Sequence, residues 1–223
     1  VIDDSADEIK KKNKKIYDKY NIDYIFLKYN SGISYGRNIG ISHVKTKYTM
    51  LLDDDNYIVD TKYLYKSIIF LDSFKNYDMV GNIIKKREIL YNKHSVAYSA
   101  DICKIENNKI YIKQNSQKIE NNFIENLYKT NILLNSFIAR TNILKKNKWN
   151  DKLKLGEHED FFINLFKKNI NISICYNWNI EEIIDDRRLY EIDNNDQKKN
   201  IHDNYKNKYI IYGKWSIYDK YLK

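Results

Sequence analysis

Apolar residues in the first third of the chain switch between two periods, which predicts alternating strands and helices. Helical spacing covers residues 5–20 and 34–44, and a further helix begins near Asp60. Runs rich in β-branched and aromatic residues indicate strands between the helices, at residues 22–29, 48–52 and 78–84. This βαβαβ rhythm predicts an α/β fold with a mostly parallel sheet flanked by helices.

Local signals refine the two N-terminal helices. Ser5 is followed three residues later by Glu8, which matches a capping box with Ser5 as the N-cap. Gly36 and Gly40 lie one turn apart in the helix at 34–44, where each is less favourable than alanine by about 1 kcal/mol. Two such glycines on one face indicate that the backbone of this helix closely approaches another part of the molecule.

The pattern changes after residue 84. The stretch "ADICKIENNKIYIKQ" alternates around a polar turn and predicts a β-hairpin, part of an insertion at residues 85–122 on the sheet edge. The remaining segments are predicted as a strand, a helix, a strand, a polar loop and a final helix, at residues 131–141, 157–169, 172–178, 179–200 and 197–212.

Composition narrows the class of function. The net charge is +9, but acidic residues are interleaved with the lysines, so a nucleic-acid module with a basic stripe and stacking aromatics is disfavoured. A ligand carrying a diphosphate would still benefit from the positive field. No apolar run approaches the roughly 20 residues of a membrane span. Cys103 and Cys175 have neither metal-site nor disulfide-scaffold spacing, which favours a reducing, cytoplasmic location.

Three consecutive aspartates, residues 53–55, follow the predicted strand at 48–52. Ligands of parallel α/β sheets bind beyond the carboxyl ends of the strands, and carboxylate oxygens suit Mg²⁺ or Mn²⁺ beside a diphosphate. Asp53 and Asp55 should share a face while Asp54 turns away, because alternate residues of an extended segment point the same way. A solvated acidic turn explains the triplet equally well when it is taken alone.

A second acidic group, "GEHED", opens the helix predicted at residue 157. The helix dipole would account for one acid, but three acids and a histidine exceed what a cap needs. A carboxylate here, aimed at a cleft, could take a proton from an attacking hydroxyl. His158 is better read as a packing or orienting group than as a metal ligand. Arg37, near the start of the helix at 34–44, is either a diphosphate contact or an ordinary surface arginine.

Four stretches occur in an order that matches one known family. They are "VIDDSAD", "NSGISYGRNIGISHVKTKYTMLLDDD", "NSFIARTNILKKNKWNDKLKLGEHEDFF" and "YGKWSI". With them the sequence resembles inverting glycosyltransferases of the GT-A type, particularly family 2. The "GEHEDFF" form resembles the branch that transfers N-acetylgalactosamine or galactose.

The resemblance implies a Rossmann-like GT-A fold in a single domain over residues 1–223. Residues 1–84 would form the nucleotide-binding half, 85–122 the insertion and 123–223 the acceptor-side half. The implied activity is metal-dependent transfer of a hexose or N-acetylhexosamine from a UDP-sugar to a hydroxyl of a glycan, glycoprotein or glycolipid.

The resemblance also implies roles for individual residues. The nucleotide-sugar would be contacted by Asp3, Asp4, Arg37, Asp53 and Asp54. Mn²⁺ or Mg²⁺ would be bound by Asp53 and Asp55. Asp160 would be the catalytic base and Glu159 its acceptor-orienting neighbour, with Trp149 bordering the acceptor pocket.

Two departures from the family pattern leave alternatives open. The family begins with an earlier strand carrying a Pro-x-Tyr-Asn-like signature, and this chain contains no proline, so the sheet would lack its first central strand unless residues precede Val1. A late histidine completes the metal shell in some relatives, and His202 is the candidate here, although its place in a helical pattern favours a surface role. A non-catalytic or fragmentary relative that binds a sugar nucleotide or glycan is therefore the main alternative, and a Mg²⁺-dependent nucleic-acid-binding protein is a weaker one.

Overall fold

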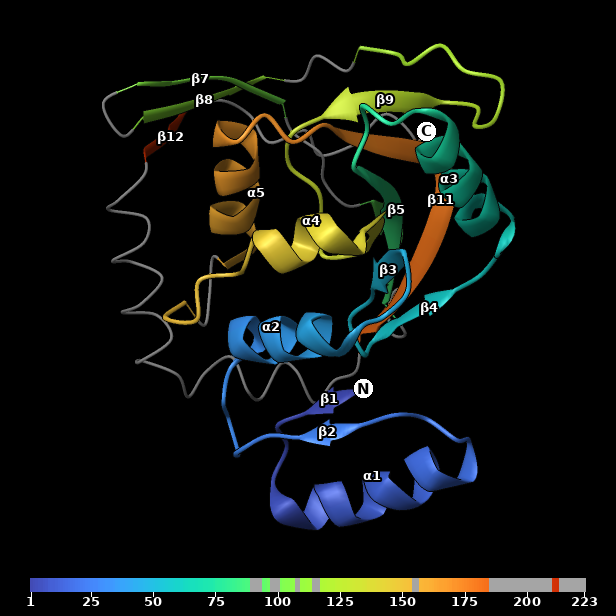
Figure 1. Cartoon of the computed structure of the whole chain (residues 1–223), viewed down its shortest axis with the longest axis vertical. Coiled ribbons are helices and arrows are strands. Elements are labelled where there is room, and N and C mark those ends of the chain that lie inside the picture. Colours follow the sequence, from blue (N-terminus) through green and yellow to red (C-terminus); the bar gives the residue numbers. More distant parts are fainter. Residues whose placement is uncertain are drawn as a thin grey trace.

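A seven-stranded sheet forms the centre of the molecule (Figure 1). The computed structural model describes residues 1–88, 94–96, 101–106, 109–113, 117–153, 157–184 and 210–212. Five strands of the main sheet lie in the order β3-β10-β5-β11-β4, while β6 pairs with β5 and β9 with β11. Their bounds are β3 Tyr48–Leu51, β4 Asn56–Ile58, β5 Met79–Glu88, β6 His94–Val96, β9 Leu127–Thr130, β10 Phe137–Arg140 and β11 Ile172–Ile184.

The main sheet is mixed, so the prediction of a mostly parallel sheet is wrong. β5 and β11 are parallel, but β10 is antiparallel to both β3 and β5, and β4 is antiparallel to β11. Strands β3, β5 and β11 do run in one direction, as the βαβ rhythm requires. The strand predicted at residues 131–141 contains β10, but the sequence pattern could not reveal that β10 is antiparallel, because the alternation along a strand carries no information about its direction.

Helices cover both faces of this sheet (Figure 1). Helix α3 Lys62–Ser73 lies on one face, and α4 Thr141–Lys146 with α5 Glu157–Lys167 lies on the other. Neighbouring residues of β5 point into different cores. Met79 packs with Phe137 and Phe162 on the α5 side, and Val80 packs with Phe70 on the α3 side. The structure therefore has two apolar layers, one on each side of the sheet.

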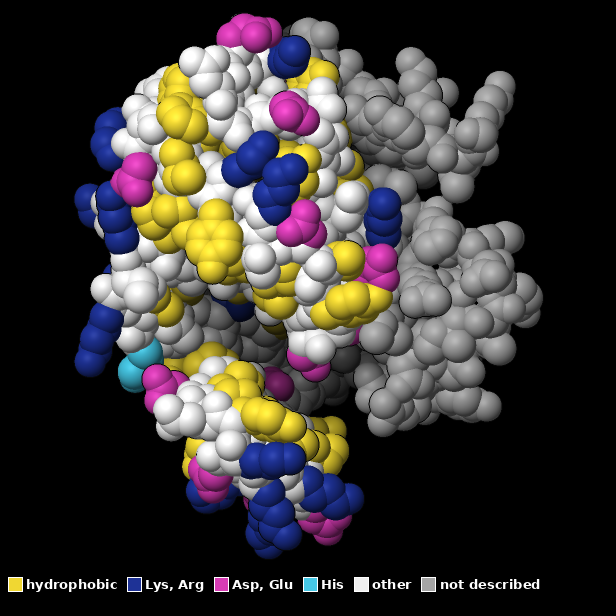
Figure 2. Space-filling view, turned by 90° about the vertical axis from the view of Figure 1, so that its right-hand side faces the viewer, with side chains coloured by type: hydrophobic (Ala, Val, Ile, Leu, Met, Phe, Trp, Pro, Cys, Tyr) yellow, Lys and Arg dark blue, Asp and Glu magenta, His cyan; other side chains and the backbone are white. Residues whose placement is uncertain are grey.

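The N-terminal segments form a separate layer. They are β1 Ile2–Asp3, α1 Asp7–Lys19, β2 Ile25–Phe26 and α2 Ile33–His43. β1 and β2 pair in parallel, and α2 lies between this pair and the main sheet (Figure 1). On the face drawn in Figure 2, a hollow separates the lower part of this layer from the main body.

The close approach predicted for α2 is confirmed, and its neighbour is β1. A Cβ on Gly40 would lie 3.0 Å from Ile2 Cγ1, and one on Gly36 would lie 3.5 Å from Ile2 Cγ2. The glycines therefore let α2 pack directly on β1. The predicted capping box is wrong: Ala6 is the N-cap of α1 and makes no side-chain cap bond. Ser5 instead donates its backbone N–H to Asp3 Oδ1 at 2.9 Å.

The predicted hairpin is confirmed, but its position differs. β7 Asp101–Glu106 and β8 Lys109–Lys113 are antiparallel, and with β12 Ile210–Tyr212 they form a separate three-stranded sheet rather than an edge of the main one. β12 is a strand where the end of the 197–212 helix was expected, and the rest of that prediction lies outside the described residues. β11 continues through Ile184, into the predicted loop. None of the described helices is long and apolar enough to cross a membrane.

Gly81 provides a test of how tightly the main sheet is packed. A Cβ at this position in β5 would lie 2.5 Å from Cδ2 of the buried Leu133. We expect Gly81→Ala to lower the free energy of unfolding by about 1–3 kcal/mol, as overpacked cores do. The measurement is urea unfolding followed by circular dichroism.

Gly36→Ala is the matched control, because its new methyl group would meet nothing closer than 3.5 Å. It should be neutral or stabilising by up to about 1 kcal/mol, since alanine is the better helix former. Leu133→Val should recover part of the Gly81→Ala loss in a double variant. Equal stability of Gly81→Ala and the wild type would contradict the packing described.

Candidate functional site

Arg37 of α2 joins the two acidic segments singled out in the sequence. Its Nη2 donates to Asp53 Oδ1 at 2.8 Å, and its Nη1 donates to Glu157 Oε1 at 3.1 Å. Only 6% of the Arg37 side chain is exposed. The end of β3 and the start of α5 therefore meet at one place, although Asp53 and Glu157 are more than 100 residues apart in the sequence.

Asn135 and Trp149 complete the surroundings of the guanidinium. With its amide oxygen facing Arg37, Asn135 accepts from Nη1 at 3.1 Å and from Nη2 at 3.2 Å. The Trp149 ring centre lies 5.8 Å from Arg37 Cζ, within cation–π range. The ring of Phe161 in α5 stacks on the Trp149 ring, with 4.0 Å between the ring centroids. We call Arg37, Asp53, Asn135 and Glu157 the Arg37 cluster.

The electrostatics of the cluster favour keeping it intact. The side chain of Glu157 is only 10% exposed, and that of Asp53 is 35% exposed. Removing one partner of a buried ion pair typically costs about 3–5 kcal/mol, because the remaining charge stays buried without compensation. One arginine faces two carboxylates, so the ionised side chains of the cluster carry a net negative charge.

Two neighbours of Arg37 on α2 hold the segment that leads into α5. Ser34 donates its hydroxyl to the carbonyl oxygen of Leu153 at 2.8 Å. Asn38 donates to the carbonyl oxygen of Trp149 at 2.9 Å and accepts from the Trp149 backbone N–H at 3.0 Å. It also donates to the Asp151 carboxylate. α2 is therefore the element that positions both sides of the site.

The three aspartates after β3 differ in exposure, and Asp54 and Asp55 lie in a turn rather than in the extended segment that the alternation argument assumed. Asp53 and Asp55 are half-buried, and Asp54 between them is exposed. Arg37 binds Asp53 through Oδ1, and no described residue donates a hydrogen bond to its Oδ2. The backbone N–H of Asn56 donates to the Asp53 carbonyl oxygen at 3.1 Å, which closes a turn with Asp54 and Asp55 at its centre.

Asp3, predicted to contact the nucleotide, is held by internal donors. Its Oδ2 accepts from Asn13 Nδ2 at 2.9 Å and from the Tyr17 hydroxyl at 3.2 Å, while Ser5 donates to Oδ1. Burial alone would raise the pKa of Asp3, but the hydrogen bonds from Asn13 and Ser5 outweigh it and lower the pKa below its ordinary value. Asp3 is therefore a charged anchor for α1.

Asp4 and Asp54 lie near the elements that surround Asp3. Asp4 Oδ2 accepts from the backbone N–H of Gly32, at the entrance to α2, at 3.0 Å. The pKa of Tyr17 is raised by burial first, then by the nearby charge of Asp3, and further by that of Asp54. Asp54 therefore lies near Tyr17, whose hydroxyl donates to Asp3.

The first turn of α5 carries the predicted base. Asp160 is buried and its Oδ2 accepts from Asn164 Nδ2 at 3.1 Å. Glu159 Oε2 lies 2.9 Å from His158 Nδ1, so the histidine contacts an acid of its own turn. Gly156 and His202 lie outside the described residues.

The carboxylates suit a metal that is shared with a ligand. Within the described ranges, no group of three or more His, Cys, Asp or Glu side chains could hold a metal ion by itself. Mg²⁺ in nucleotide sites is commonly bound by only one or two carboxylates together with phosphate oxygens and water. Asp53 and Asp55 fit that pattern, because their hard oxygen ligands would need a diphosphate to complete the shell.

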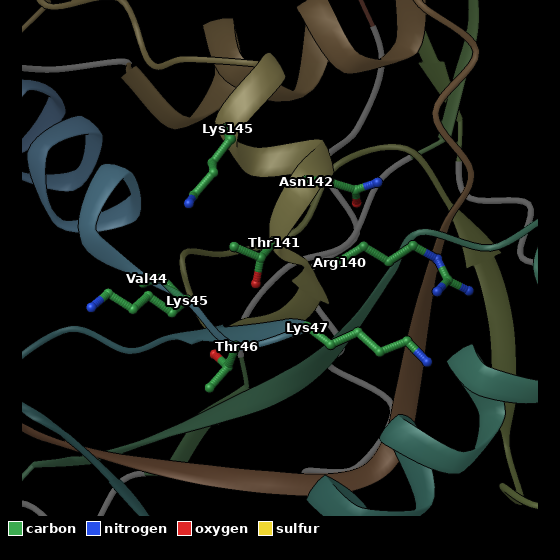
Figure 3. A pocket seen from close by; sticks show the side chains of 8 residues that line it. All are labelled: Val44, Lys45, Thr46, Lys47, Arg140, Thr141, Asn142 and Lys145. Atoms are coloured by element: carbon green, nitrogen blue, oxygen red, sulfur yellow. The ribbon is translucent and has the colours of Figure 1, made fainter.

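A cavity of about 330 Å³ lies at the other end of β3, and Figure 3 shows the side chains that line it. Two of its cations serve the fold. Arg140 donates from Nε to the Tyr77 carbonyl oxygen at 3.0 Å, and Lys47 forms an ion pair with Asp72. Both side chains point away from Lys45 (Figure 3). The cavity is therefore separate from the aspartates, which follow the last residue of β3 rather than its first.

Sequence reasoning did not assign a role to Glu157 or Asn135. Glu157 was noticed only as one member of an acid-rich turn, and Asn135 was not singled out. The available signals were a third acid beyond the need of a helix cap, and an asparagine just before the apolar strand β10. Neither signal identifies Arg37 as the partner of these residues, because the contact joins segments that are far apart in the sequence.

Three comparisons with known proteins were made. The family model for glycosyl transferase family 2 matches residues 1–136, which is more than half of the chain. A search of curated protein sequences found no match. Among solved structures, S. aureus TarS residues 1–349 in complex with UDP aligns with a TM-score of 0.54 and 19% identity, covering 86% of this chain and 52% of that one.

A second similar structure is GalNAc-T7 with UDP, GalNAc and Mn²⁺. It aligns with a TM-score of 0.60 and 12% identity over 82% of this chain and 37% of that one. At these identities the likeness concerns the α/β fold of GT-A glycosyltransferases alone, and this chain spans 52% of the TarS chain and 37% of the GalNAc-T7 chain. The match to the family model is the finding that assigns the family, and by it the chain belongs to glycosyl transferase family 2.

Proposed function

We propose that this chain is a metal-dependent inverting glycosyltransferase. It would move a hexose or N-acetylhexosamine from a UDP-sugar to a hydroxyl of a glycan, glycoprotein or glycolipid. The observation that carries the proposal is the bridge from Asp53 through Arg37 to Glu157, because it brings the strand-end aspartates and the acids of α5 to one site. Membership of family 2 supports the reaction class.

On the donor side, Asp53 and Asp55 would hold Mn²⁺ or Mg²⁺, which would offset the negative charge that grows on the leaving diphosphate. The bound UDP of the TarS structure and the UDP and Mn²⁺ of the GalNAc-T7 structure support this choice of donor and metal. Asp4 and Asp54, with Asp3 behind them, would face the nucleoside. This assignment is supported by the nearness of Asp54 to Tyr17, whose hydroxyl donates to Asp3.

On the acceptor side, Asp160 would take the proton of the attacking hydroxyl. The hydroxyl oxygen forms a bond to the anomeric carbon as the bond from that carbon to the diphosphate oxygen breaks, so UDP leaves and the configuration inverts. Asn164 holds one oxygen of Asp160, which fixes the carboxylate within the helix turn. Glu159 would orient the acceptor.

The donor site can be tested by binding alone. UDP with Mn²⁺ should raise the thermal unfolding midpoint by mass action, and 100-fold saturation over Kd corresponds to about 2.7 kcal/mol. We expect Asp55→Ala to remove the Mn²⁺-dependent part of this shift, measured against the unfolding midpoint of the same variant without ligand. Differential scanning fluorimetry checks both.

Glu120→Gln is the control for this measurement, because Glu120 is exposed and lies outside the site. It should retain the full Mn²⁺-dependent shift. If Asp55→Ala also retained the shift, the metal assignment would be wrong.

The base can be tested by turnover. Asp160→Asn should lower UDP release from UDP-hexoses or UDP-N-acetylhexosamines by about 10²- to 10⁴-fold, the usual worth of general-base catalysis. The same variant should still show the UDP–Mn²⁺ midpoint shift, since Asp160 is not assigned to the donor. Glu159→Gln should lose less activity than Asp160→Asn.

Product assays with candidate acceptors and anomeric analysis by NMR complete the experiment. Full activity of Asp160→Asn would show that the assignment of Asp160 as the base is wrong. Donor binding by the wild type without any UDP release would instead favour the non-catalytic relative.

A further inference from the structure

The Arg37 guanidinium is committed to protein groups rather than left facing a ligand. Nη1 bonds Glu157 and Asn135, Nη2 bonds Asp53 and Asn135, and 6% of the side chain is exposed. A direct diphosphate contact would require these bonds to break. The geometry suits a different task, which is to hold two segments at a fixed separation.

We propose that Arg37 and Glu157 form a positioning pair that sets the distance between the Asp53–Asp55 tip and the base-bearing turn of α5. The proposal rests on the function proposed above and adds Glu157 to it. Neither residue touches the reacting atoms. Arg37 acts by holding Asp53 Oδ1, and Glu157 acts by holding Arg37 in place from the first residue of α5.

The fork of the guanidinium explains why an arginine occupies this position. Its two terminal nitrogens reach Asp53 and Glu157 at once, at 2.8 and 3.1 Å, with the oxygen of Asn135 placed within 3.2 Å of both nitrogens. A lysine ammonium carries the same charge on a single point and lacks this planar fork. The bridge therefore depends on the shape of the group as well as on its charge.

The pair would influence the donor site through Asp53. Asp53 is bonded by Arg37 at Oδ1 only, so the orientation of its carboxylate, and hence the direction in which Oδ2 points, depends on Arg37. Partners that orient a ligating carboxylate typically change metal affinity or activity by about 10- to 100-fold when they are mutated. The pair would influence the acceptor side because Glu157 and Asp160 belong to the same turn of α5.

Three variants test the pair. Glu157→Gln keeps the size of the side chain and an acceptor oxygen but removes the charge. Arg37→Lys keeps the charge but removes the fork, and the third variant combines both changes. The affinity for UDP in saturating Mn²⁺ is measured by isothermal titration calorimetry, and UDP release gives kcat and KM.

We expect each single variant to weaken UDP–Mn²⁺ binding by about tenfold, within the range for partners of this kind. The double variant should lose little more than Arg37→Lys alone, because both changes break one bridge, whereas independent effects would multiply to about 100-fold. Glu157→Gln remains informative if the Arg37 variants do not fold, since it alters a single charge.

Asp78→Asn is the matched control. Asp78 lies directly before β5, and one of its carboxylate oxygens is 3.8 Å from Arg140 Nε. The two residues form a second largely buried arginine–aspartate pair, at the other end of the sheet. The Asp78→Asn variant should change the unfolding midpoint while leaving UDP–Mn²⁺ affinity and KM as in the wild type. A Glu157→Gln variant that behaves in the same way would overturn the proposal and reduce Glu157 to a structural role.

A measurement without ligand separates this proposal from the proposed function. In hydrogen exchange, Glu157→Gln should speed the exchange of the amides at residues 52–56 together with those at the start of α5, and Asp78→Asn should not. Exchange that changes at α5 alone would overturn the coupling. A wild type that binds no UDP with Mn²⁺ would overturn the proposed function, and the exchange result would still decide whether the bridge couples the two segments.

Discussion

The site depends on one buried positive charge shared by two carboxylates. Arg37 faces both Asp53 and Glu157, so it cannot neutralise them fully, and two further acids, Asp54 and Asp55, follow Asp53 directly. The chain as a whole carries +9, yet its candidate site is locally acidic. This local excess is where a divalent cation would be bound most favourably, and the surrounding positive field favours the approach of an anionic donor.

The sequence predicted the elements of this fold better than their arrangement. Amphipathic spacing located α1, α2, α3 and α5, and β-branched runs located β3, β5, β7, β8 and the first part of β11. The errors concern interactions that local pattern does not encode. Ser5 has the identity of an N-cap, but its hydroxyl and backbone N–H bind the buried Asp3 instead, so the tertiary contact overrides the local signal.

Candidate site residues were predictable in proportion to how unusual they look in the chain. Three consecutive aspartates and an acidic helix start are conspicuous, whereas Glu157 and Asn135 become meaningful only through Arg37. The sequence suggests either a diphosphate contact or a surface position for Arg37, because it shows a helix N-terminus nearby. It carries no information about the two carboxylates, which belong to distant segments. Because the Arg37 side chain is buried in the structure, its charge needs hydrogen-bond partners within the protein.

The mixed sheet explains how the two halves of the site come together. Because β10 runs antiparallel to β3, its first residue, Phe137, pairs with Leu51 at the end of β3, and the chain just before it brings Asn135 to Arg37, which also bonds Asp53. Had β10 run parallel to β3, its last residue, Arg140, would lie there instead of at the far end, where it binds Tyr77. The family match ends at residue 136, just before β10, and the acids of α5 lie beyond it. Strand β10 therefore connects the part of the chain that matches the family model to the segment that carries the acids of α5, and Arg37 bonds to both.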